Sequence, residues 1–324
     1  MNRTKRSICL AASVCLLLML SCFAAEAKDE IRFGYLVADQ LHSPAVMIMK
    51  EKKLLEAEGL KVNWGEYLAG SYLMQFMTSG EVDFGSCGAP PVMITRGQGV
   101  KVSILASSNT EGSSLVVKDS IKSVKDLDGK KIGTPGIGSI QDALIDRIAQ
   151  QNNIKIIHKS MKVSDMPVFL QKGEIDGFIA WAPHPARAVD LGYGHELLTS
   201  HDILPGHQCC VLIAREELVQ KDPETVKKVM TAYLKAFDYF RANFDECVAL
   251  MAKMTGMKEE VVRLALKTTV HPYPPDCDIP SIKMMTDTLV ETGKIEKGSI
   301  TSVDDLIKTT YHPEFMEECM KAKK

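Results

Sequence analysis

The sequence predicts an α/β protein made of two similar lobes with a ligand cleft between them. Strand-like apolar segments alternate with helix-like segments from residue 31 to residue 181, which is typical of parallel sheets covered by helices on both faces. A set of residues also recurs at a constant offset of 93 positions. The chain of 324 residues is long enough for two such units.

The repeat consists of one short motif and several single matches at the same offset. Gly80-Glu81-Val82-Asp83 recurs as Gly173-Glu174-Ile175-Asp176. The further matches are Ala89-Pro90 with Ala182-Pro183, Gly99 with Gly192, Ser71 with Ser164, and Phe76 with Phe169. Several matches at one offset indicate two copies of one supersecondary unit.

Each copy predicts three strands joined by helices. In the first copy we expect strands at 31–37, 60–67 and 82–86. The helices between them begin at Ser43-Pro44 and at Ser71, end at Gly59 and Gly80, and are followed by one from Pro90. In the helix after Ser71, the residues expected to face inward are Leu73, Phe76 and Met77.

The second copy follows the same plan. We expect strands at 131–134, 154–158 and 175–181, and a helix at 164–172. The sequence Ser139-Ile140-Gln141-Asp142 fits the S-x-x-D capping pattern and predicts a helix start.

From about Arg215 the chain reads as helical. Asp222-Pro223 predicts the start of a long helix. Its apolar face predicts a packing surface formed by Val226, Val229, Met230, Tyr233, Leu234, Phe237 and Phe240.

The first 27 residues read as a signal peptide. A basic start with Arg3, Lys5 and Arg6 precedes an apolar run at 8–20, and Ala25-Glu26-Ala27 fits a cleavage site before Lys28. Lipid attachment at Cys22 is the alternative. Either reading predicts export, with the periplasm as the expected location.

Composition excludes some classes of partner and leaves the disulfides open. Hydrophobic residues make up 45% and charged residues 25% of the chain, and the net charge is −2. Without a basic stripe we expect no nucleic-acid partner. After the signal peptide, the cysteines whose pairing the sequence does not determine are Cys87, Cys209, Cys210, Cys247, Cys277 and Cys319.

Three motifs carry a resemblance to a known family. They are Gly80 to Gly85 followed by Gly88-Ala89-Pro90-Pro91, the run from Gly129 to Ser139, and the run from Asp176 to Pro183. With these motifs, the chain resembles the sulfonate, taurine, nitrate and thiamine-precursor group of substrate-binding proteins of ABC importers. The resemblance implies a periplasmic-binding-protein type II fold.

In that fold two segments cross between the lobes. The resemblance implies a first lobe of residues 28–115 plus 214–324 and a second lobe of residues 116–213. The crossovers are expected near 113–118 and 211–215, which are apolar and strand-like.

The resemblance also implies a function. We expect a monomeric, non-catalytic protein without a cofactor that captures a small organic anion, or a nitrogen heterocycle, by hinge closure and delivers it to an ABC permease in the inner membrane. An enzyme on the same scaffold, of the pyrimidine-precursor or menaquinone-pathway type, is one alternative. A soluble ligand sensor is the other, although no further membrane segment follows residue 27.

Two glycine-serine pairs are candidate anion contacts. Gly70-Ser71 and Gly138-Ser139 each place a hydroxyl group at a predicted helix start, where unpaired N–H groups and the helix dipole attract anions. Simple N-capping is the alternative role for both serines.

Other candidates follow predicted strands. Gln40 and His42 come after the first strand, and a protonated His42 could donate to an oxyanion. The amides of Cys87-Gly88-Ala89 could form an anion nest, with the Cys87 side chain as a small buried filler. Trp181 could stack on a ligand or pack at the hinge.

We expect no metal site. His207, Cys209 and Cys210 include metal-binding residue types, but a strand through them would point neighbouring side chains to opposite faces. The glycines from Gly133 to Gly138 match neither the dinucleotide nor the P-loop pattern, and no hydrolase motif is present in the sequence.

Overall fold

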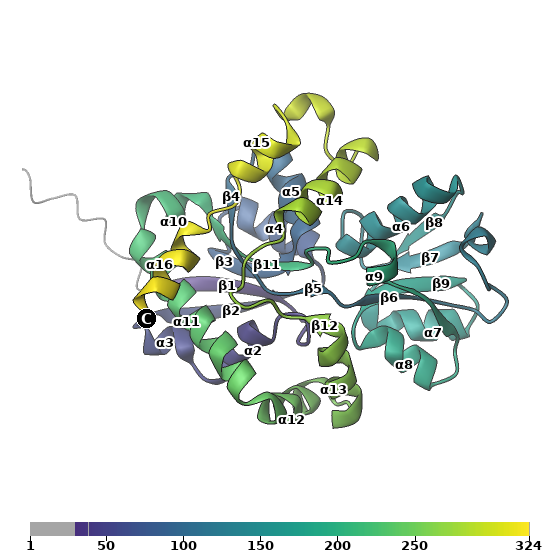
Figure 1. Ribbon diagram of the computed structural model, residues 1–324, viewed down its shortest axis with the longest axis horizontal. Helices are drawn as coiled ribbons and strands as arrows, with labels where there is room; N and C mark the ends of the chain where they lie inside the picture. The colour runs from purple at the N-terminus through teal and green to yellow at the C-terminus, as the bar shows by residue number, and fades with distance from the viewer. Residues whose placement is uncertain (1–29, 38, 324) are drawn as a thin grey trace, which may run out of the picture.

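The computed structural model describes residues 30–37 and 39–323. Two five-stranded sheets lie side by side, each with helices on its faces (Figure 1). The predicted signal peptide and Cys22 fall outside the described residues. Within those residues, no helix is both long enough and apolar enough to cross a membrane.

The first sheet has the strand order β2-β1-β3-β11-β4. Strands β2, β1 and β3 run parallel, whereas β11 runs antiparallel to both β3 and β4. The bounds are β1 (Glu30–Leu36), β2 (Lys61–Tyr67), β3 (Phe84–Gly88), β4 (Val102–Ser107) and β11 (Cys210–Arg215).

The second sheet has the strand order β10-β6-β9-β7-β8. Strands β9, β7 and β8 run parallel, and β6 runs antiparallel to β9 and β10. The bounds are β6 (Ser113–Val117), β7 (Lys131–Thr134), β8 (Ile157–Ser160), β9 (Gly177–Trp181) and β10 (His195–Thr199). The prediction of parallel sheets is therefore confirmed for the three strands of each repeat, whereas β6 and β11, which lie where the chain passes between the sheets, run antiparallel to their neighbours.

A two-stranded ribbon of β5 (Thr110–Glu111) and β12 (Thr269–Val270) lies between these sheets (Figure 1). The remaining elements are helical. The α-helices up to β11 are α2 (Pro44–Glu51), α3 (Leu54–Ala57), α4 (Gly70–Thr78), α5 (Ala89–Gly97), α6 (Ile140–Asn152), α7 (Met166–Gln171), α8 (His184–Asp190) and α9 (Ser200–Ile203). Those after β11 are α10 (Glu216–Lys221), α11 (Pro223–Ala242), α12 (Phe244–Thr255), α13 (Glu259–Thr268), α14 (Ile279–Glu291), α15 (Val303–Lys308) and α16 (Glu314–Ala322), and the 3-10 helices are η1 (Val124–Leu127), η2 (Val163–Asp165) and η3 (Lys297–Ser299).

Most predicted elements are present, with shifted ends. The helix predicted to run from Ser43 to Gly59 is split into α2 and α3 by Lys53, which has a left-handed φ of 52°. The strand predicted at 154–158 begins only at Ile157. Phe76, predicted to face inward, is 40% exposed, whereas Leu73 and Met77 are buried.

The internal repeat corresponds to a repeated structure. Gly80 and Gly173 each follow a helix with left-handed φ values of 79° and 76°. Three residues later, the Asp83 carboxylate accepts a hydrogen bond from the Arg32 N–H at 2.9 Å, and the Asp176 carboxylate accepts one from the Lys131 N–H at 3.0 Å. Each aspartate therefore fixes the start of a central parallel strand, β1 or β7.

The long helix α11 anchors the C-terminal segment on the first sheet. Its N-cap is Asp222, whose side chain accepts a hydrogen bond from the Thr225 N–H, and Pro223 occupies the first turn. All seven apolar residues predicted for its packing face are buried, in one core with residues of β1, β11 and α2. This core packs against β1 and β3, whose last residues border the candidate site.

Candidate functional site

A cavity of about 30 Å³ lies where the two sheets face each other. Its wall includes Leu36 and Gly88, which end β1 and β3, and Gly70, which follows β2. The second sheet contributes Pro135, which follows β7, and Trp181, which ends β9. Ligands of α/β sheets bind outside the carboxyl ends of parallel strands, so this is the place where a ligand is expected.

Five of the ten predicted ligand contacts line this cavity. They are His42, Gly70, Gly88, Ser139 and Trp181. The other five do not border it: Gln40, Ser71, Cys87, Ala89 and Gly138. The residues that the sequence did not single out as ligand contacts are Leu36, Asp39, Ala69, Pro91, Pro135, Ile140, Gln141, Cys209 and Cys210.

The two glycine-serine loops face each other across the lobes. Ser71 and Gly138 line a neighbouring cavity of about 390 Å³. A Cβ atom added at Gly138 would lie only 2.6 Å from Ile94 Cδ1, so the halves touch at this point. The Ser139 hydroxyl accepts a hydrogen bond from the Asp142 N–H at 3.1 Å and caps α6 while it borders the cavity.

One amide of the predicted anion nest is already bonded within the protein. The Ala89 N–H donates to the Cys209 carbonyl oxygen at 2.8 Å, and the prolines that follow Ala89 have no N–H group. The Cys87 side chain is fully buried, and this burial raises the pKa of its thiol. Cys87 therefore fills space in the core, as predicted.

Gln40 is turned towards its own loop. Its side-chain nitrogen donates to the Val37 carbonyl oxygen at 2.6 Å. Gln141, on the first turn of α6, lines the cavity instead, and its side-chain nitrogen donates to Ser113 Oγ at 2.9 Å. This bond ties the start of α6 to β6, a strand of the second sheet.

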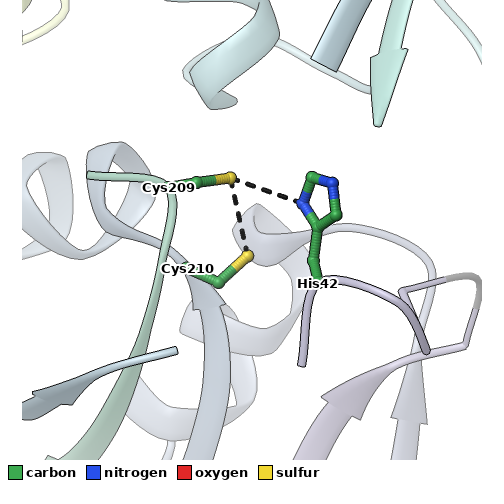
Figure 2. Close-up of side chains that lie close together, drawn as sticks. All are labelled: His42, Cys209 and Cys210. Atoms are coloured by element: carbon green, nitrogen blue, oxygen red, sulfur yellow. Dashed lines mark hydrogen bonds between the residues drawn. The ribbon is translucent and has the colours of Figure 1, made fainter. Parts of the chain in front are cut away.

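One side of the cavity carries a cluster of buried polar groups. His42 Nδ1 lies 3.5 Å from Cys209 Sγ, and the Sγ atoms of Cys209 and Cys210 lie 3.8 Å apart (Figure 2). Cys210 Sγ lies 3.5 Å from Asp39 Oδ2. All four side chains are at most 4% exposed.

The prediction that the thiols of Cys209 and Cys210 point to opposite faces of a strand is wrong. Strand β11 begins at Cys210, so Cys209 lies before the strand and side-chain alternation does not apply to it. Asn109 holds both residues, because its carbonyl oxygen accepts from the Cys209 N–H at 3.1 Å and its Oδ1 accepts from the Cys210 N–H at 3.0 Å. His207 is not part of the cluster, whose histidine is His42.

Burial and mutual proximity shift the pKa values in this cluster. A hydrogen bond from Cys210, aided by His42, lowers the pKa of the Cys209 thiol well below its usual value. The same contact raises the pKa of Cys210. Burial alone would lower the pKa of His42, but Cys209 and Asp39 outweigh it and raise the value to about 9. Burial raises the pKa of Asp39 to about 7.

A larger cavity of about 410 Å³ lies beside β6, α9 and α13. It is bordered by Glu111, Glu196 and His201, and His201 Nδ1 lies 2.6 Å from Glu111 Oε1. This cavity meets the carboxyl end of one parallel strand, β9, through Ala182, whereas the smaller cavity is bordered by residues at or after the ends of β1, β3, β7 and β9. The smaller cavity is therefore the better candidate for the ligand site.

Comparisons with known proteins agree with this architecture. The model of the NMT1-like family matches residues 24–255. The taurine-binding periplasmic protein of Escherichia coli (strain K12) is 24% identical over 276 residues, which are 80% of this chain and 85% of that protein. A binding protein of Brucella abortus (strain 2308) is 30% identical over 316 residues, 90% of this chain and 94% of that protein.

A solved structure shows the same fold. The periplasmic nitrate-binding protein NrtA from Synechocystis PCC 6803 superposes with a TM-score of 0.76 at 14% identity, covering 91% of this chain and 89% of that one. The matches confirm the family resemblance and the fold predicted from the motifs. These relatives are named as binding proteins, in agreement with the prediction that the chain is not an enzyme.

Proposed function

Because the chain belongs to the NMT1-like family, we propose that it is the extracytoplasmic solute-binding protein of an ABC importer. It captures a small organic anion, such as a sulfonate, taurine or a nitrate-like ion, or a nitrogen heterocycle, between two lobes that close by hinge motion. We assign residues 28–115 plus 214–324 to the first lobe and residues 116–213 to the second, apart from the crossing segments, since β6 pairs within the second sheet and β11 within the first. The protein acts in the periplasm as a monomer and passes its solute to an inner-membrane permease.

One observation carries this proposal. The cavity is walled by segments that follow the carboxyl ends of β1, β2 and β3 on one side and of β7 and β9 on the other. A volume of about 30 Å³ holds little more than one or two water molecules. A solute therefore enters when the lobes separate, and closure then removes it from water.

An anionic group fits the positive ends of two helices. Ala69 and Gly70 begin α4, and Ser139 and Ile140 begin α6, and all four residues border the cavity. Helix N-termini carry partial positive charge and unpaired N–H groups. The cavity lining includes no lysine or arginine among the described residues, so these helix starts and His42 are its sources of positive potential. The named ligands of the relatives, taurine and nitrate, support an anion as the solute.

A thermal-shift screen of residues 28–324 tests the proposal. The panel contains sulfonates, taurine, nitrate, bicarbonate, pyrimidines and amino acids, and the buffer contains a metal chelator. A solute at a thousand times its dissociation constant adds about 4 kcal/mol to the stability of the native state. We expect one class of anion to shift the transition and to be recovered unchanged; a panel without any shift would refute the proposal.

A pair of serine variants separates binding from stability. Ser139→Ala removes a cap that borders the cavity, whereas Ser302→Ala removes a matched cap at α15, where Ser302 accepts from the Asp305 N–H. Each loses about 1 kcal/mol of stability. We expect only Ser139→Ala to lose the solute-induced shift, and equal shifts in both variants would remove Ser139 from the site.

A further inference from the structure

We propose that His42, Cys209 and Cys210 form a binding site for one thiophilic metal ion, with Zn²⁺ as the reference ion and with the carboxylate of Asp39 next to it. The sequence predicted no such site, and the inference goes beyond the proposed function. It concerns a metal ion at one wall of the cavity and does not depend on the identity of the solute.

Three protein donor atoms already stand close enough to share one ion, because His42 Nδ1, Cys209 Sγ and Cys210 Sγ all lie within 4.8 Å of one another. Two sulfur atoms at the usual zinc–sulfur distance lie about 3.8 Å apart, and a sulfur and a nitrogen or oxygen ligand lie about 3.5 Å apart. Here the sulfur–sulfur distance is 3.8 Å, Cys209 Sγ to His42 Nδ1 is 3.5 Å, and Cys210 Sγ to Asp39 Oδ2 is 3.5 Å. The two oxygens of Asp39 face different members of the cluster, since Oδ1 lies 3.7 Å from His42 Nδ1 and Oδ2 lies 3.5 Å from Cys210 Sγ. The carboxylate must therefore turn, or a water molecule must enter, to fill the fourth position around the ion.

The histidine is held in the orientation that a metal ligand needs. His42 Nε2 lies 2.9 Å from the Gly112 carbonyl oxygen, to which it donates a hydrogen bond. This bond assigns the proton to Nε2 in the neutral ring and leaves the Nδ1 lone pair facing Cys209 Sγ (Figure 2). Such a bond from the second ring nitrogen commonly orients a metal-binding histidine.

The two thiols are fixed by the backbone before any ion arrives. Asn109 accepts hydrogen bonds from the N–H groups of both Cys209 and Cys210, and β11 pairs with β3 from Cys210 onward. The donors come from the loop after β1 and the start of β11, both in the first sheet. An ion could therefore bind while the lobes are apart.

Asp39 supplies a second, independent indication. Its residue is 3% exposed, and its Oδ1 atom is buried without a hydrogen-bond partner. Leaving a buried carboxylate oxygen unsatisfied costs free energy, and such groups are uncommon in native structures. Both this oxygen and the paired thiols gain a partner when a cation occupies the cluster.

A vicinal disulfide is the main competing state of the two cysteines. It would require the sulfur atoms to lie about 2.0 Å apart instead of 3.8 Å. The six cysteines of the described residues are all free thiols. Oxidation would remove two of the three grouped donors, so the experiment is carried out on reduced protein.

The direct test uses residues 28–324, reduced, freed of metal with a chelator and titrated with Co²⁺ and Zn²⁺. We expect one equivalent of Co²⁺ to give intense tetrahedral bands with thiolate-to-metal charge-transfer absorption, and Zn²⁺ to displace it. A thiol count on the same sample shows that the cysteines are reduced. If the reduced, unmodified protein shows no charge-transfer absorption with Co²⁺, the proposal is overturned.

Three variants assign the ligands. Cys209→Ser and Cys210→Ser are compared with Cys247→Ser, which changes a buried cysteine on α12 outside the cluster. Loss of a supporting residue around a metal ligand weakens affinity about 10- to 100-fold, so loss of a thiolate ligand should weaken Zn²⁺ binding by about 100-fold or more. The control should bind Zn²⁺ as the unmodified chain does. Equal affinities in all three variants would overturn the assignment.

The outcomes separate this inference from the proposed function. A solute-induced thermal shift in chelator, with no Co²⁺ spectrum, leaves the binding protein standing and removes the metal site. A Co²⁺ spectrum without any solute-induced thermal shift supports the metal site and refutes the proposed solute-binding function.

Discussion

Lys294 Nζ lies 2.9 Å from Asp142 Oδ2, and this ion pair joins segments that pack on different sheets. Asp142 lies on α6, whose Leu144 and Ile145 belong to the core of the second sheet. Lys294 follows α14 and precedes Ile295, which is buried in a core of the first sheet. The lysine also pairs with Asp146 on the next turn of α6. These contacts hold the two halves together in the structure.

Lys294→Ala should weaken the closed arrangement. The Asp142 side chain is 1% exposed, so removal of the lysine leaves a buried carboxylate without its cation. Loss of one partner of a buried ion pair costs about 3 kcal/mol. Urea unfolding should show this loss, and solute affinity should fall.

Lys283→Ala is the matched control for this variant. Lys283 pairs with Asp304 at 2.8 Å, but both side chains are more than 40% exposed. Exposed pairs contribute between about 0 and 1 kcal/mol. A loss as large as that of Lys294→Ala would show that the position of the ion pair between the lobes has no special role.

Stability should depend on pH through Asp142. Burial alone would raise its pKa, but hydrogen bonds from His158 and the Gly138 N–H, with Lys294, lower the pKa below the usual value. A lowered folded-state pKa stabilises the fold above about pH 3.9, and this contribution is lost as the pH falls through the folded value. Asp142→Asn should lower stability at pH 7, and its difference from the unmodified chain should shrink below about pH 4. A difference that stays constant from pH 7 to pH 3 would contradict this assignment.

The repeated aspartates should differ in importance. Asp83 is fully buried and binds the side chains of Arg32 and Arg215 at 2.9 Å, whereas the Asp176 side chain is 27% exposed and pairs with Lys118. Asp83→Ala should therefore cost about 3 to 5 kcal/mol and Asp176→Ala about 1 kcal/mol in denaturant unfolding. Similar losses in both variants would mean that the shared backbone contact, and not the pairing of Asp83 with two arginines, sets the cost.

Gly112→Ala should weaken Zn²⁺ binding without changing a donor atom. A Cβ atom at this position would lie 2.6 Å from His42 Nε2, so the imidazole must move. We expect a loss of about 10- to 100-fold in Zn²⁺ affinity, measured by competition with a chelator. Gly99→Ala is the control, because Gly99 has a similar φ of +86° but no atom within 4 Å of the added Cβ. Equal losses in the two variants would indicate a backbone effect instead of displacement of His42.

Local patterns predicted the fold well. The S-x-x-D motif at Ser139 caps α6, and Asp222-Pro223 starts α11, because these signals act within one helical turn. The offset of 93 predicted a duplicated unit, and Asp83 and Asp176 do make the same backbone hydrogen bond. Periodicity could not locate strand ends to the residue, as the late start of β8 shows.

The cluster at the cavity could be predicted only in part. His42 and Cys209 are separated by 167 positions, so no local pattern relates them. The predicted direction of the Cys209 side chain depended on whether Cys209 was placed inside the strand or before it. Within a strand, a shift of one residue turns a side chain to the opposite face of the sheet. The available signal was the vicinal pair Cys209-Cys210 at the start of an apolar strand, together with Asp39 three residues before His42.

Fluorescence of Trp181 tests the central claim most directly, namely that a solute binds where the strand ends of both lobes meet. The chain has two tryptophans, and Trp64 packs on Phe33 in the first lobe with ring centroids 5.0 Å apart. Trp64→Phe therefore leaves Trp181, in the cavity wall, as the single reporter. We expect its emission to change and to saturate as solute is added. The midpoint of this titration should equal that of a calorimetric titration with the same solute. Solute binding detected by calorimetry, with the emission of Trp181 unchanged, would contradict it.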